Sequence, residues 1–150
     1  ADENVSARRG LILRLGALPA SALGCKASKL IRALAQEVRG ADLPGGKEHD
    51  DPQTRQYSVI ALGRLCLELP ASGEDLDIVV SALEAAMADY AADRRGDVGS
   101  WVRETAMEVI AALLEAQARP PGPALHGVET TTRLVGLLLQ QAVEKIDRLR

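Results

Sequence analysis

Apolar residues return every three or four positions along most of this chain, which is the spacing of one face of an α-helix. Six stretches carry this pattern, and clusters rich in Gly, Pro and Asp interrupt it. The pattern predicts principal helices at about residues 4–18, 26–39, 52–69, 74–91, 98–117 and 128–149. No run of alternating apolar and polar residues is bounded by turns, so no sheet is expected. The predicted fold class is all-α.

Each predicted helix has one apolar face that should turn towards a core. In chain order, these faces are Leu11, Leu15 and Leu18; Leu30, Ile31, Leu34 and Val38; Val59, Leu62, Cys66 and Leu69; Leu76, Val79, Val80, Leu83, Met87 and Tyr90; Val102, Ala106, Val109 and Leu113; and Val135, Leu138, Ala142, Ile146 and Leu149. One helix start is specified in detail. Asp51 offers an N-cap acceptor, and Pro52 occupies the first helical position, where a missing N–H costs nothing.

The chain also resembles itself at a period near 47 residues. When the chain is aligned with itself at this period, Arg8, Arg55 and Arg103 fall in one column of the alignment, 47 and 48 residues apart. The small residues Gly16, Gly63 and Ala111 share another, and Leu15, Leu62 and Ile110 are expected in equivalent environments. A helical period of this length is typical of HEAT and armadillo repeats. The sequence therefore predicts three stacked helical hairpins, at about residues 1–47, 48–95 and 96–150, forming part of an α-solenoid.

Composition narrows the classes of partner and compartment. The net charge is −3, with 18 basic and 21 acidic residues interspersed, which disfavours nucleic acid as a partner. No apolar run approaches the ~20 residues of a membrane span, so no membrane insertion is expected. Cys25 and Cys66 are isolated thiols, expected to act as small buried apolar residues in a reducing compartment. The chain opens without Met and closes on a helical run, which suggests a segment cut from a much longer chain.

Candidate catalytic and ligand-binding groups are weak. The segment from Gly40 to Glu48 superficially resembles a phosphate loop but lacks the Ser or Thr that would hold Mg²⁺. We interpret the whole segment from Gly40 to Asp50, like the segment from Arg119 to Gly127, as an exposed loop. His49 and His126 have no Cys or carboxylate at ligand spacing. We therefore expect a binding protein, not an enzyme, with no cofactor, metal or catalytic residue.

Three stretches of sequence resemble one known family. They are Arg95-Gly96-Asp97-Val98-Gly99-Ser100-Trp101-Val102-Arg103, Leu15-Gly16-Ala17-Leu18-Pro19 and Gln140-Gln141-Ala142-Val143-Glu144-Lys145-Ile146-Asp147-Arg148-Leu149-Arg150. Their amino-acid sequences and their order along the chain resemble the C-terminal half of the tubulin-folding cofactor D family, which are large chaperones built from HEAT and armadillo-type repeats.

This resemblance implies a function in tubulin assembly. Members of the family capture β-tubulin after the cytosolic chaperonin and assemble or take apart the α/β-tubulin heterodimer. The implied partners are β-tubulin, tubulin-folding cofactors E and C and an Arf-like small GTPase, and the complex stimulates GTP hydrolysis by tubulin. The implied location is the cytoplasm and the microtubule cytoskeleton. The alternative is a generic HEAT-repeat scaffold or adaptor, similar to a phosphatase scaffold or a transport receptor.

The candidate site residues fall into two groups. Arg94 and Arg95 lie in a predicted basic loop, Ala92 to Gly99, hinged by Gly96 and Gly99, and they are candidates for contact with a partner, since tubulin is acidic as a class. Trp101 is a third candidate, either at the core edge or on a binding ridge. Asp97, Arg103, Arg55 and Arg8 are expected to be structural, in ladders that fix the angle between repeats, with Asp97 as an N-cap.

Overall fold

The computed structural model describes residues 2–40, 51–69, 73–118 and 127–144, and in these ranges the protein is all-α. Its principal helices are α1 (Asp2–Gly16), α3 (Ala27–Val38), α5 (Pro52–Glu68), α6 (Glu74–Met87), α7 (Gly99–Gln117) and α8 (Gly127–Val143). A short helix, α2 (Ala20–Leu23), and a 3-10 turn, η1 (Gly24–Lys26), precede α3. The six predicted helices are therefore confirmed, with shifts of a few residues at their ends.

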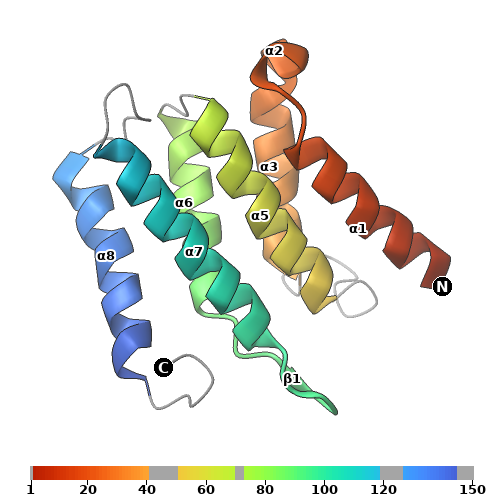
Figure 1. Cartoon of the computed structure of the whole chain (residues 1–150), viewed down its shortest axis with the longest axis vertical. Helices are drawn as coiled ribbons and strands as arrows, with labels where there is room; N and C mark the ends of the chain where they lie inside the picture. The colour runs from red at the N-terminus through yellow and green to blue at the C-terminus, as the bar shows by residue number, and fades with distance from the viewer. Residues whose placement is uncertain (1, 41–50, 70–72, 119–126, 145–150) are drawn as a thin grey trace.

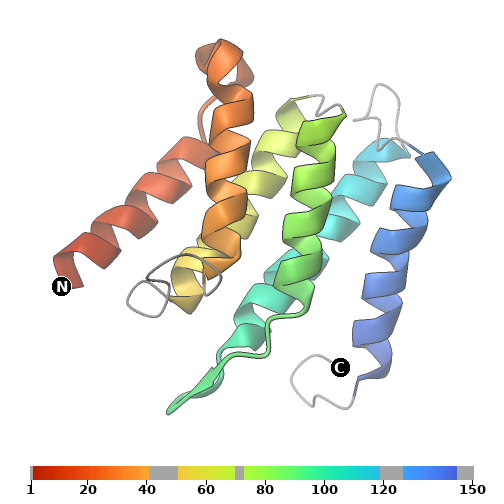
Figure 2. The ribbon, with the colours of Figure 1, turned by 180° about the vertical axis from the view of Figure 1, so that it is seen from behind.

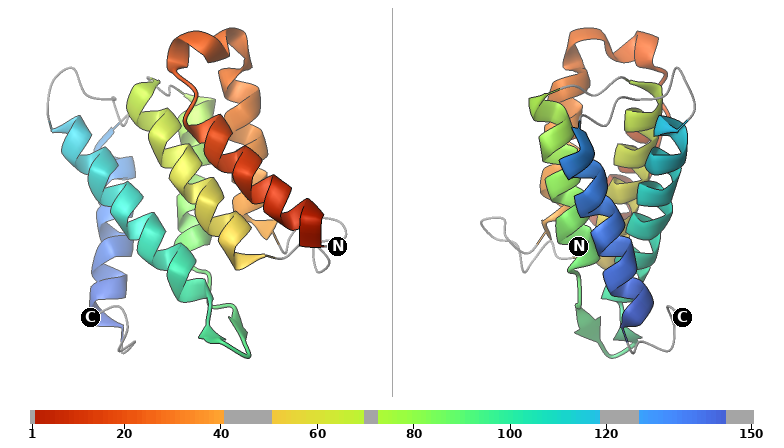
Figure 3. Two further views of the ribbon diagram at one scale, coloured as in Figure 1. Left: turned by 45° about the vertical axis from the view of Figure 1, so that its right-hand side comes forward. Right: turned by 90° about the vertical axis from the view of Figure 1, so that its left-hand side faces the viewer.

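The helices form two layers. Figure 1 shows α1, α5 and α7 side by side in front, and Figure 2 shows α3, α6 and α8 side by side from behind. The edge-on view in Figure 3 separates the two layers. It shows that successive principal helices along the chain lie in alternate layers. Helix α5 is the most enclosed, because it packs against α1, α3, α6 and α7.

The core fills the space between the layers. Val59 and Leu62 of α5, Val79 and Leu83 of α6 and Val102 of α7 are all 0% exposed. These side chains recur every three or four residues, so the predicted apolar faces of α5, α6 and α7 mostly do point inward. Burial of such stripes supplies most of the stability of helices this short.

The start of α5 follows the predicted cap. The Asp51 carboxylate accepts a hydrogen bond from the backbone N–H of Thr54 at 2.9 Å, and Pro52 occupies the first turn. The same carboxylate accepts two further bonds from the guanidinium of Arg9 in α1, both at 2.7 Å. Asp51 therefore caps one helix and joins it to its neighbour in the layer.

Two glycines allow the helices of the front layer to approach closely. A Cβ on Gly16 of α1 would lie 2.5 Å from the Cα of Ala61 in α5, and a Cβ on Gly63 of α5 would lie 2.7 Å from Val109 in α7. Any larger residue would push the helices apart. Gly16 and Gly63, which occupy equivalent positions in the predicted 47-residue repeat, thus make the same kind of contact with the next helix of the layer.

The predicted inward face of α1 is wrong. Ile12 and Gly16 are buried, whereas Leu11 is 57% exposed and Leu18 is 37% exposed. Because Gly16 lies against Ala61, the side of α1 that carries Gly16 and Ile12 faces α5, and Leu11 turns outward. Leu15 is only partly buried, unlike Leu62 and Ile110, since the described chain places a neighbour on one side of α1 only.

The predicted inward face of α8 is only partly right, since Leu138 does pack against the core. Leu134 and Gln141 are buried, while Val135 and Ala142 are exposed. The helix carries a second apolar stripe on its outer side, which includes Leu139 at 63% exposure. Apolarity alone could not decide between the two stripes.

The end of α6 differs from the prediction as well. The helix ends at Met87, and Tyr90, expected in the core, is 51% exposed. The chain turns instead into two paired two-residue strands, β1 (Ala92–Asp93) and β2 (Gly96–Asp97), where no strand was expected. Other predicted features lie outside the described residues, namely most of the loop from Gly40 to Asp50, nearly all of the loop from Arg119 to Gly127, the ends of the chain, His49, His126, Ile146 and Leu149.

Candidate functional site

The short hairpin between α6 and α7 carries the candidate contact residues. Its strands are antiparallel, with Ala92 opposite Asp97 and Asp93 opposite Gly96. Gly96 has a φ of 102°, a conformation that other residues rarely adopt, so the tight turn depends on it. Figure 1 shows the hairpin projecting beyond the ends of the surrounding helices, and Arg94 and Arg95 are exposed at its tip.

The two arginines at the tip differ in how they are held. The Asp93 carboxylate accepts hydrogen bonds from the Arg95 backbone N–H at 2.7 Å and from its Nη2 at 2.6 Å. The bond from the Arg95 side chain is the main reason that the pKa of Asp93 lies below its ordinary value. Arg94 makes no hydrogen bond or ion pair with any other described residue. Its charge is therefore the more available of the two.

Trp101 lies next to the hairpin on the first turn of α7. Its side chain is partly buried, and the guanidinium of Arg95 lies over the ring, 5.1 Å from the centroid. A cation over an indole face is attracted by the ring electrons. The structure therefore brings Arg95 and Trp101 together at one end of the molecule.

The base of the hairpin is closed by Gly99, which is not a hinge as predicted. The Gly99 backbone N–H donates to the carbonyl of Ala91 at 2.8 Å. A Cβ at Gly99 would lie 2.6 Å from Oδ1 of Asp89 and 2.7 Å from the nitrogen of Ala91. This glycine is needed because the two ends of the hairpin touch, so the connection is fixed by packing.

A fully buried arginine ties the hairpin to α7. Arg103 is 0% exposed, and its Nη2 donates to Oδ2 of Asp97 at 2.7 Å. Its Nη1 donates to the backbone carbonyl of Asp89, and its guanidinium lies over the Tyr90 ring, 4.4 Å from the centroid. Asp97 also accepts from the backbone N–H of Ser100 at 3.0 Å, so it caps α7 while it pairs with Arg103.

A second buried arginine reaches the same place from α5. Nε of Arg55 donates to Oδ2 of Asp89 at 2.7 Å, and the two side chains are only 6% and 10% exposed. Asp89 therefore binds Arg55 through its carboxylate and Arg103 through its carbonyl. Sequence reasoning missed Asp89. A buried Arg55 requires an acidic partner, which the sequence could have predicted. The sequence does not show which of the many Asp and Glu residues is that partner.

The remaining arginine of the predicted series behaves differently. Arg8 of α1 is partly buried, but the paired hydrogen bonds to the next helix come from its neighbour Arg9. Arg9 was not among the predicted site residues. The ion pair changes the pKa of both groups. Burial raises the pKa of Asp51, but the hydrogen bonds from Arg9 and Thr54 outweigh burial and lower this pKa overall. The hydrogen bond to Asp51 raises the pKa of Arg9.

The structure also places the two thiols and the potential metal ligands. Cys66 is buried, which is the main reason that its pKa is raised to about 12, and the nearby charge of Asp75 adds to the effect. Cys25 is exposed, so the prediction that it is buried is wrong. Within the described ranges, no group of three or more His, Cys, Asp or Glu side chains could hold a metal ion. None of the described helices has the length and apolarity needed to cross a membrane.

Comparison with known proteins finds similarity to a tubulin-folding cofactor. Tubulin-folding cofactor D of Schizosaccharomyces pombe is 34% identical over 77 residues, which is 51% of this chain. The chain spans 7% of the length of that relative. No protein-family model matches the chain, and no solved structure matches it.

Proposed function

We propose that this chain is a segment of a tubulin-folding chaperone and that it acts by binding proteins, not by catalysis. The observation that carries the proposal is the 34% identity to tubulin-folding cofactor D over 77 residues. On this proposal the chain contributes to the capture of β-tubulin and to assembly and disassembly of the α/β-tubulin heterodimer in the cytoplasm. Tubulin-folding cofactors E and C and an Arf-like small GTPase are the further proposed partners.

We also propose that the two layers are part of a HEAT-type solenoid. Three contacts repeat at nearly the same separation in the chain, which supports this reading. Gly16 meets Ala61 and Gly63 meets Val109, which are 45 and 46 residues apart, and the Ser28 hydroxyl donates to Asp75, 47 residues away. Stacked repeats bury one continuous core and leave long surfaces for a large partner.

The hairpin, which occupies the predicted loop from Ala92 to Gly99, is the proposed contact with the partner. Its base is fixed by Arg103 and Gly99, so its tip is presented without a large loss of conformational freedom on binding. Arg94 is available for a carboxylate of the partner, while the Arg95 guanidinium is shared between Asp93 and the Trp101 ring. A rim of exposed positive charge mainly accelerates association, and salt weakens its effect.

The test is binding of purified α/β-tubulin to the immobilised 150-residue chain at two salt concentrations, about 50 mM and about 300 mM. The electrostatic screening length is shorter at the higher concentration, so attraction between exposed charges is weaker there. We expect Arg94→Glu with Arg95→Glu to weaken tubulin binding about tenfold at the lower salt and less at the higher. The matched control is Arg14→Glu with Arg64→Glu, which reverses two charges exposed on α1 and α5.

Two outcomes contradict the proposal in different ways. Undiminished binding by the hairpin variant at both salt concentrations would remove this hairpin from the interface. Absence of tubulin binding by the unaltered chain, with recovery of unrelated proteins from cytosol, would favour a scaffold of another complex.

A further inference from the structure

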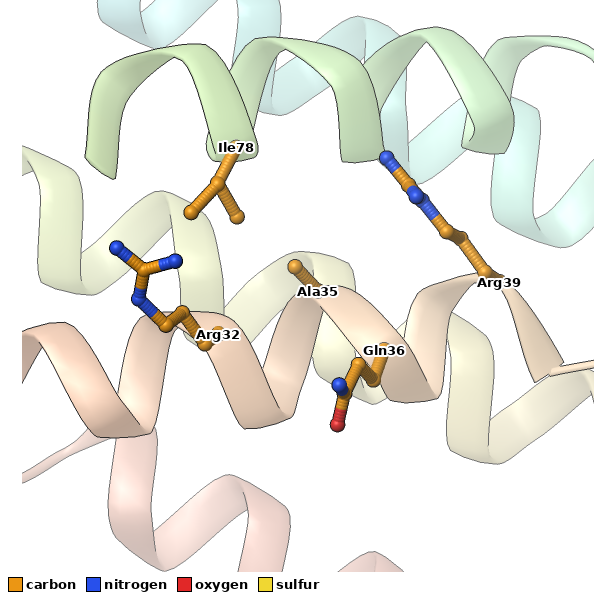
Figure 4. A pocket seen from close by; sticks show the side chains of 5 residues that line it. All are labelled: Arg32, Ala35, Gln36, Arg39 and Ile78. Carbon is orange, nitrogen blue, oxygen red and sulfur yellow. The ribbon is translucent and has the colours of Figure 1, made fainter. Parts of the chain in front are cut away.

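A groove in the layer formed by α3, α6 and α8 has a distinctive charge pattern. It lies between α3 and α6, has a volume of about 210 Å³, and is lined by Arg32, Ala35, Gln36, Arg39 and Ile78. Figure 4 shows Arg32 and Arg39 both reaching from α3 towards α6, with Ala35 and Ile78 between them. Gln36 points away from α6. The groove is thus a small apolar floor with a guanidinium at each end.

The two guanidinium groups have different partners. Nη2 of Arg32 lies 3.0 Å from Oε2 of Glu74 and 3.7 Å from Oδ1 of Asp75. The Glu74 side chain is 77% exposed, so a carboxylate from outside can replace it at little cost. Arg39 donates only to the neutral hydroxyl of Ser81, at 2.6 Å, and forms no ion pair within the described ranges.

The acids of α6 do not neutralise the Arg39 end. Glu74 and Asp75 lie at the Arg32 end, and Glu84 is bound by Arg133 of α8 at 2.5 Å. Asp77 is exposed and forms no ion pair with another described residue. The groove therefore has one cation balanced by replaceable acids and one cation that pairs with no acid among the described residues.

The spacing of the two cations defines what could bind. Arg32 and Arg39 are seven residues apart on one face of α3, so their backbones are about 10 Å apart. An extended peptide covers that distance in about three residues. Arginine binds a carboxylate with two parallel hydrogen bonds when the geometry allows.

We propose that this groove binds an extended acidic peptide segment of a partner protein. One carboxylate of the segment pairs with Arg39, a second, three or four residues away, replaces Glu74 on Arg32, and an apolar side chain between them lies on Ala35 and Ile78. The site does not use the hairpin, so it can succeed or fail independently of the proposed tubulin contact.

The test is fluorescence anisotropy of a labelled peptide with the core Glu-Glu-Leu-Glu-Glu, titrated with the 150-residue chain at low salt. We expect saturable binding, and we expect Arg39→Glu to weaken it about tenfold while Arg39→Lys weakens it less. Arg39 is exposed, so thermal melting of both variants should match that of the unaltered chain. Ile78→Ala should weaken binding about threefold by removing part of the apolar floor.

Two controls make the result specific. Arg64→Glu reverses an exposed charge on α5 in the opposite layer, and Arg94→Glu with Arg95→Glu reverses the hairpin tip; both should bind the peptide normally. The proposal is overturned by absence of saturable binding up to about 1 mM peptide, by equal binding of a peptide with Gln in place of every Glu, or by equal weakening in Arg64→Glu.

Discussion

Arg103 shows how one side chain can decide the geometry of a connection. Its charge is completely buried, and it is paired with Asp97, with the Asp89 carbonyl and with the face of Tyr90. Burial of an unpaired charge is very costly, so these contacts must be present together. The consequence is that the end of α6, the hairpin and the start of α7 are held as one unit.

This arrangement predicts a large effect of Arg103→Ala on stability. The substitution removes a donor from the Asp89 carbonyl and the Arg103 charge from beside Asp97, so the free energy of unfolding should fall by about 1–3 kcal/mol. Chemical denaturation measures the change, with the exposed Arg94→Ala as the control, expected within about 0.5 kcal/mol of the unaltered chain. An unchanged denaturation midpoint together with lost tubulin binding would instead make Arg103 a contact residue.

At the scale of helices, Asp51 joins two neighbours in a layer. It caps α5 through Thr54 and receives the guanidinium of Arg9 from α1. Its folded-state pKa lies below the ordinary value of 3.8 because the bonds from Arg9 and Thr54 outweigh the opposing effect of burial. A group with a lowered pKa stabilises the folded state above its ordinary pKa, and this contribution disappears as pH falls through the folded-state value.

We therefore predict that Asp51→Asn destabilises the protein at pH 7 and that the difference from the unaltered chain shrinks below about pH 4. Asn is nearly as good an N-cap as Asp, so this substitution removes mainly the charge. Urea denaturation at several pH values measures the difference. Asp77→Asn, at an exposed position on α6, is the control. A difference that stays constant from pH 7 to acid would show that the ion pair with Arg9 contributes nothing.

At the scale of the whole molecule, the helices differ in how completely they are enclosed. Helix α5 packs against four helices, α1, α3, α6 and α7, whereas α8 packs against α6 and α7 and turns an apolar stripe outward. Local opening is easiest where few buried contacts must be broken. Stability should therefore decrease from the middle of the layers towards α8.

Native-state hydrogen exchange tests this order. Amides of α5 around Val59 to Leu65 should exchange most slowly, and amides of α8 around Leu134 to Gln141 should exchange faster, because α8 can detach without opening the core around α5. The comparison is internal, since both segments are regular helix. Equal protection of α5 and α8 would mean that the layers unfold only as a single cooperative unit.

The sequence by itself determined the features that depend on residues close together in the chain. The helical periodicity, the all-α class, the cap at Asp51 with Pro52 and the capping contact of Asp97 all involve groups within about one helical turn. The same is true of the exposure of Arg94 and Arg95, which follows from charge in a short connection.

Only the tertiary structure decided which side of α1 and α8 faces inward, which acid receives Arg55 and which arginine reaches Asp51. Each depends on the rotation and separation of helices that are distant in the chain. The close contact of Gly16 with Ala61 sets the rotation of α1, so Ile12 is buried instead of Leu11 and Arg9 bonds to Asp51. Spacing along one helix cannot supply that information, because two faces of the same helix can be equally apolar until a neighbour packs against one of them.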